Sequence, residues 1–125
     1  MKTLTLFVLL LVTASLFLSA TGCSQSKPPE PLPADGAPTE FAKAFAKAKP
    51  EAKALASDAV AAMQAKRYPE ASALFLQLSQ TPDLSAPERE FVTRAMLGVN
   101  RQLQEAQAQG DAQATEHLRR LQQSK

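Results

Sequence analysis

Residues 55–83 read LASDAVAAMQAKRYPEASALFLQLSQTPD, and this stretch decides the fold. Within it, Ala71, Leu74, Phe75 and Leu78 recur at positions i, i+3, i+4 and i+7, which is the spacing of one buried helix face. Proline is tolerated in the first turn of a helix, so this helix should extend from about Pro69 to Ser79.

A second periodic segment precedes it, from about Pro50 to Lys66. Its expected buried residues are Leu55, Ala59, Ala62 and Met63, with Val60 at the edge. Only Arg67 and Tyr68 separate the two helices, and so short a junction forces them into an antiparallel hairpin. The sequence therefore predicts a small all-α domain.

Residues 55–83 also resemble one tetratricopeptide repeat, a family of paired helices. Ala59 and Ala71 match the small residues at which the two helices of a repeat cross. Tyr68 matches the aromatic residue of the turn, and Phe75 matches the large apolar residue of the second helix. The resemblance implies that these four residues either pack the hairpin or contact a partner. A solenoid needs about three repeats to share a core, so this hairpin is either isolated or completed by a partner.

Two further helices are expected toward the C-terminus. After a loop at residues 81–87, the longest helix should extend from Pro87 to about Gln109. Gly98 inside it costs about 1 kcal/mol relative to alanine, and its expected role is the close crossing of another helix. Gly110 should end this helix, and Asp111 should cap a last helix with a narrow apolar stripe.

Toward the N-terminus, a short amphipathic helix is expected from Thr39 to about Ala48. Phe41 and Phe45 share one face of it, and Lys43 and Lys47 lie opposite. The helix either lies on an anionic membrane surface, with phenylalanine in lipid and lysine at the headgroups, or packs its phenylalanines onto the domain. Low-complexity disorder of this Ala- and Lys-rich segment is a third interpretation.

Residues 24–38, SQSKPPEPLPADGAP, contain five prolines, which disfavour both helix and sheet. Proline-rich segments adopt extended conformations of about 3.1 Å per residue, so this segment could hold a domain up to roughly 45 Å away. We therefore expect a tether over residues 23–38 and a helical domain over residues 39–125.

The first 22 residues have the features of an export signal. Lys2 precedes an uncharged apolar stretch, and small residues follow from Ser19 to Gly22. The stretch of about 15 residues is shorter than the roughly 20 that a membrane-spanning helix needs. Removal of residues 1–22 is expected. The alternatives are an ordinary secretory signal, which leaves Cys23 as a free thiol, and an uncleaved anchor.

Ala20-Thr21-Gly22-Cys23 resembles the lipobox of bacterial lipoproteins. The resemblance implies cleavage before Cys23, a diacylglyceryl group on its thiol, and membrane lipid as a partner. One acyl chain holds a protein only marginally, whereas two or more hold it durably. By the same resemblance, Ser24 favours the outer membrane if the host is Gram-negative.

Composition argues against several classes of function. A net charge of +2, 6% aromatic residues and no tryptophan are atypical of a nucleic-acid-binding protein. His117 is the only histidine and Cys23 the only cysteine, so no catalytic triad or zinc motif can be assembled. Glycine-rich phosphate loops are missing too. We expect no enzyme activity, no catalytic residues, no metal and no other cofactor.

Two functions of different classes remain. The first is a lipid-anchored envelope protein whose helices form an interaction or scaffold module for another envelope protein or a peptide. The alternative is a membrane-surface or structural lipoprotein, in which residues 39–49 lie on lipid and the remaining helices self-associate.

Overall fold

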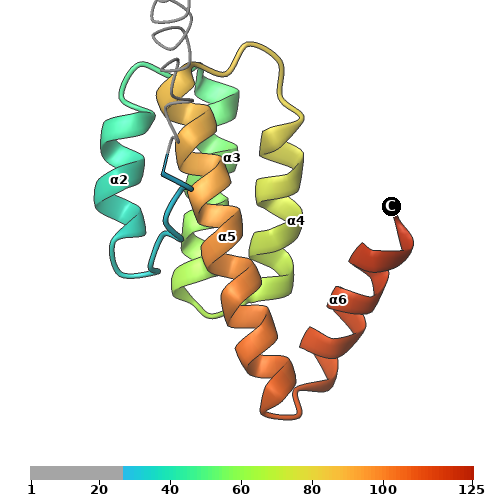
Figure 1. The fold of residues 1–125 in the computed structure, drawn as a ribbon. Helices are drawn as coiled ribbons and strands as arrows, with labels where there is room; N and C mark the ends of the chain where they lie inside the picture. Colours follow the sequence, from blue (N-terminus) through green and yellow to red (C-terminus); the bar gives the residue numbers. More distant parts are fainter. Residues whose placement is uncertain (1–26) are drawn as a thin grey trace, which may run out of the picture.

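A computed structural model describes residues 27–125, which form five α-helices and no strand (Figure 1). The helices are α2 (Ala37–Ala44), α3 (Pro50–Gln64), α4 (Tyr68–Ser79), α5 (Ala86–Ala108) and α6 (Ala112–Gln123). From α3 onward, each helix packs against the next in an antiparallel array, and α2 packs on α3 and α5. The free end of α6 diverges from the bundle (Figure 1). The predicted all-α fold is confirmed.

The starts of the helices follow from their sequences. Each of α2, α3, α4 and α5 has a proline in its first turn, where a missing N–H costs nothing. At α5, the Ser85 side chain accepts a hydrogen bond from the Glu88 N–H, and the Glu88 carboxylate accepts one from the Ser85 N–H. This reciprocal cap fixes the first turn of the longest helix.

Small residues allow α3 and α4 to approach closely. Ala59 and Ala71 are fully buried, as is Phe75. The hairpin predicted for residues 50–79 is therefore present, and these three residues pack it. Val60, expected at the edge of the core, is only 5% exposed, whereas Leu55 is only partly buried.

Four phenylalanines join α2, α4 and α5 into one core. The ring centroid of Phe91 lies 5.4 Å from that of Phe45, 6.2 Å from that of Phe75 and 6.3 Å from that of Phe41. Edge and tilted contacts at these distances are favourable for aromatic rings. The amphipathic helix thus packs its phenylalanines onto the domain, which is one of the interpretations left open by the sequence.

The membrane-surface interpretation of this segment is wrong for its apolar face. Phe45 is 0% exposed and Phe41 is partly buried, so their rings contact protein in this structure. Lys43 and Lys47 are exposed, as predicted for the polar face. The helix also ends earlier than predicted, at Ala44, where Phe45 (φ −103°, ψ 14°) leaves the helical conformation. Lys49, which precedes Pro50, is extended (φ −60°, ψ 144°) and separates α2 from α3.

The domain begins before residue 39, which corrects the predicted tether. We call residues 30–36 the strap; Figure 1 shows this blue segment between α2 and α5. Leu32 of the strap is 1% exposed, and its N–H donates to the carbonyl oxygen of Arg94 over 2.9 Å. The Arg94 Nε donates to the carbonyl oxygen of Glu30 over 3.1 Å. The prolines do keep this backbone extended, but it lies on α5 instead of projecting away from it.

Gly98 explains why the strap can lie so close to α5. A Cβ atom at this position would lie 2.1 Å from the Leu32 carbonyl oxygen, far inside van der Waals contact. The close approach predicted for Gly98 therefore exists, but its nearest neighbour is the backbone of the strap, with the Met63 side chain of α3 next.

Candidate functional site

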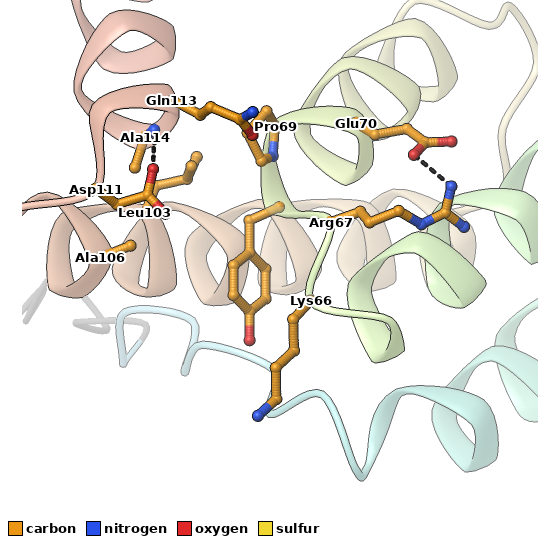
Figure 2. A pocket seen from close by; sticks show the side chains of 10 residues that line it. Lys66, Arg67, Pro69, Glu70, Leu103, Ala106, Asp111, Gln113 and Ala114 are labelled. Carbon is orange, nitrogen blue, oxygen red and sulfur yellow. Dashed lines mark hydrogen bonds and ion pairs between the residues drawn. The ribbon is translucent and has the colours of Figure 1, made fainter.

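A surface hollow of about 310 Å³ lies where the α3–α4 turn meets the α5–α6 corner (Figure 2). It is the place in the structure where the predicted residue Tyr68 reaches the surface. Its lining comes from both corners and from α5: Lys66, Arg67, Tyr68, Pro69, Glu70, Leu103, Ala106, Asp111, Gln113 and Ala114.

The α3–α4 turn positions Tyr68 through a defined helix ending. Lys66 has a left-handed backbone (φ 59°), and its N–H donates to the Met63 carbonyl oxygen over 3.1 Å. The Arg67 N–H donates to the Ala62 carbonyl oxygen over 2.9 Å. This pair of bonds is a Schellman motif, in which glycine usually occupies the position of Lys66. The motif reverses the chain within three residues and places Tyr68 at the first position of α4.

A second Schellman motif, at the α5–α6 corner, builds the opposite wall of the hollow. Gly110 (φ 87°) donates its N–H to the Gln107 carbonyl oxygen over 3.0 Å, and the Asp111 N–H donates to that of Ala106 over 3.0 Å. The Asp111 carboxylate then accepts the Ala114 N–H over 2.9 Å and caps α6 (Figure 2). The predicted roles of Gly110 and Asp111 are confirmed.

Charges of both signs surround the hollow. Arg67 and Glu70 form an ion pair at 2.6 Å, drawn as a dashed line in Figure 2, and both side chains are about half exposed. Lys66 is exposed, and the Asp111 carboxylate is engaged at the start of α6. Beneath them, Leu103 is buried and Ala106 is partly buried. An apolar floor with a mixed polar rim suits a peptide or protein surface better than a small charged ligand.

His117 is the one side chain near the hollow that could transfer protons at neutral pH. It lines a neighbouring hollow with Pro69 and Arg120. Burial lowers the pKa of His117 below its ordinary value, and the positive charge of Arg120 lowers it further. Its Nε2 atom is buried and has no hydrogen-bond partner within residues 27–125. The other described residues that line this hollow include no serine, threonine or cysteine that His117 could activate as a nucleophile.

Glu116 beside it is occupied by two arginines. Hydrogen bonds from Arg119 and then Arg120 lower the pKa of the Glu116 carboxyl group, whose oxygens lie 2.8 Å and 2.9 Å from the two guanidinium groups. The carboxylate is therefore held ionised on the surface of α6. In the part of the chain that the structure describes, no group of three His, Cys, Asp or Glu side chains is placed to hold a metal ion.

The predicted site residues thus separate into three groups. Ala59, Ala71 and Phe75 are buried and cannot contact a partner while the domain is folded. Tyr68 lines the hollow and can. Cys23, predicted to carry lipid, lies outside the described residues. None of the helices within residues 27–125 is long and apolar enough to cross a bilayer.

Sequence reasoning missed the residues that α5 and the α5–α6 corner contribute to the hollow. Leu103 and Asp111 are 35 or more positions away from Tyr68. The available signal was the Gly110-Asp111 pair, which predicts a helix ending next to a helix start. It does not predict that this corner faces the α3–α4 turn.

No protein-family model, curated protein or solved structure matches this chain. The tetratricopeptide and lipoprotein resemblances therefore stay predictions.

Proposed function

We propose that this chain is a lipid-anchored protein of the bacterial cell envelope, whose helical domain binds another envelope protein or peptide at the Tyr68 hollow. The observation that carries the anchor is the position of Cys23. The only cysteine of the chain directly follows the small residues that end an export-type apolar segment. By the lipobox resemblance, the outer membrane is the proposed location in a Gram-negative host.

The Tyr68 hollow supports the interaction part of the proposal. Tyrosine presents a rigid apolar ring and a polar tip at low entropic cost, which is why it is enriched at binding surfaces. Here, a half-buried tyrosine lies on a floor built from α5, between two corners that backbone hydrogen bonds hold rigid. Pre-formed geometry of this kind reduces the entropic cost of binding a partner.

The same residues support a non-catalytic role. Around the hollow, Arg67 and Glu70 are paired with each other, the Asp111 carboxylate accepts a backbone N–H, and Lys66 is exposed to water. The alternative function, a self-associating lipoprotein with residues 39–49 inserted in lipid, loses its main support because Phe45 is buried in the domain.

Photocrosslinking at Tyr68 tests the interaction. With Tyr68→benzoylphenylalanine in the full chain, we expect ultraviolet light to yield a discrete adduct with an envelope protein in the producing cells. Leu76→benzoylphenylalanine is the matched control, because Leu76 is on the same helix and is 41% exposed, but does not line the hollow. The control variant should yield no adduct of that mass.

Helix content measured by circular dichroism must be the same in both variants, so that a lost adduct cannot be attributed to unfolding. Equal adducts at positions 68 and 76, or none at position 68, would contradict a partner site at this hollow.

A further inference from the structure

The strap determines where the upstream chain leaves the domain. Glu30 lies beside Arg94, and Ala34 shares a hollow with Gln102 and Glu105, which are further along α5. The strap therefore runs parallel to α5. Followed backwards from Glu30, the chain heads toward the end of the bundle at which α5 begins.

That end of the bundle is formed by two connections. The α2–α3 connection and the α4–α5 loop lie together there, and a hollow lined by Lys47, Thr81 and Ser85 lies between them. Lys49 and Asp83 join the two connections at 3.5 Å. We call the exposed charged residues of these connections and of the first turn of α3 the basal surface: Lys47, Lys49, Glu51, Lys53 and Asp83. The Tyr68 hollow lies at the opposite end, where α3 ends and α4 begins (Figure 1).

If Cys23 is anchored in lipid, the short segment between Cys23 and Glu30 keeps the basal surface close to the membrane. Glu30 is seven positions after Cys23, and a fully extended chain covers about 3.5 Å per position, so this segment, the leash, spans at most about 25 Å. Arg94 is eight residues after Ala86, which is about 12 Å along the axis of α5. Measured along the axis of α5, the sulfur can therefore lie at most about 13 Å beyond the start of α5.

We infer that the basal surface faces the bilayer and contacts anionic lipid headgroups, while the Tyr68 hollow points away from the membrane. The inference depends on the proposed anchor at Cys23 and assigns the anchored domain one orientation. If the strap were free, about seven more residues would lengthen the leash by roughly 25 Å, and the domain could turn.

The charges of the basal surface agree with this orientation. The basal surface carries three lysines and two carboxylates, Glu51 and Asp83, a net charge of +1, while the Glu88 carboxylate beneath it is buried and caps α5. Lys49 and Asp83 are both mostly exposed, so water weakens their ion pair and Lys49 can still attract lipid phosphate. A single lysine near an anionic membrane attracts it only weakly, so the leash restricts the orientation and the charges select the lipid.

Lysine footprinting on vesicles tests this orientation. Residues 23–125 include every described helix, and Cys23 is their only thiol, so a maleimide lipid couples the chain to vesicles at that position. A membrane-impermeant acetylating reagent then modifies exposed lysines, and mass spectrometry reads the rate at each. We expect anchoring to phosphatidylglycerol vesicles to slow the acetylation of Lys47, Lys49 and Lys53 severalfold. Lys66, beside the Tyr68 hollow, should react at the rate of the unanchored chain.

The Gly98→Ala variant is the matched control, because it displaces the strap and changes no residue of the basal surface. Its basal lysines should lose most of their protection. Equal protection of Lys66, or full protection in Gly98→Ala, would overturn the orientation. Equal protection on pure phosphatidylcholine would overturn the assignment of anionic headgroups. Because the lipid is attached chemically, these results do not depend on whether cells acylate Cys23.

Discussion

Phe91→Ala should lower the free energy of unfolding by about 3–5 kcal/mol, the usual cost of deleting a buried aromatic side chain. Phe91 is 4% exposed, and its ring contacts rings from both α2 and α4. Removing it leaves a cavity where three helices meet, and neighbouring rings cannot fill that cavity without moving a helix. Native proteins are stable by only about 5–15 kcal/mol, so the variant should lose a large fraction of the stability of the domain.

Urea denaturation followed by circular dichroism measures this loss. Leu97→Ala is the matched control, because Leu97 is on the same helix and is 37% exposed. It should cost less than about 1 kcal/mol, as most surface substitutions do. Similar losses in the two variants would mean that the phenylalanine cluster is not the centre of the core.

Gly98→Ala should destabilise the domain by about 1–3 kcal/mol, the usual cost of overpacking a close contact. Helix propensity alone predicts the opposite sign, because alanine in a helix is favoured over glycine by about 1 kcal/mol. The structure decides between these effects, since the new Cβ would lie 2.1 Å from the Leu32 carbonyl oxygen and 3.3 Å from the Met63 methyl group. The strap must therefore leave α5, which exposes Leu32.

Hydrogen exchange at the Leu32 N–H, which donates to Arg94, should accelerate strongly in Gly98→Ala. Combining Gly98→Ala with Leu32→Ala gives a further check. Both substitutions act on the same contact, so the double variant should lose less stability than the sum of the single variants. A Gly98→Ala protein more stable than the wild type, with slow exchange at Leu32, would show that the strap does not depend on Gly98.

Local patterns predicted most of the helical fold. The prolines at positions 50, 69 and 87 lie in the first turns of α3, α4 and α5, and Gly110 ends α5. These features act within a few residues of themselves, so a single sequence is enough to interpret them. The spacing of Phe41 and Phe45 likewise predicted a buried helix face, but not whether protein or lipid would cover it.

The strap could not be predicted for a related reason. Proline-rich composition predicts an extended backbone, but it does not say what that backbone contacts. Leu32 is one apolar residue among prolines and has no periodic neighbours. Its burial depends on Gly98, which is 66 positions away and whose missing side chain was assigned to a helix crossing.

Of the residues that line the candidate site, the sequence predicted only Tyr68. The sequence indicated Tyr68 as the aromatic residue of a turn, and Tyr68 does line a surface hollow. The other three residues, Ala59, Ala71 and Phe75, are buried and pack the hairpin. The rest of the hollow depends on the angle between α5 and α6, which tertiary packing sets. The sequence also did not predict the left-handed backbone of Lys66, because the usual signal for that conformation is glycine and not lysine.

The intact mass of the mature protein, extracted from the membranes of producing cells, tests the proposed anchor most directly. We predict a chain that begins at Cys23 and carries the added mass of a diacylglyceryl group, with or without a further acyl chain on its amino group. The Cys23→Ser variant should lack this mass and leave the membrane fraction. A wild-type product without acyl mass, or one that begins at any other residue, would contradict the account.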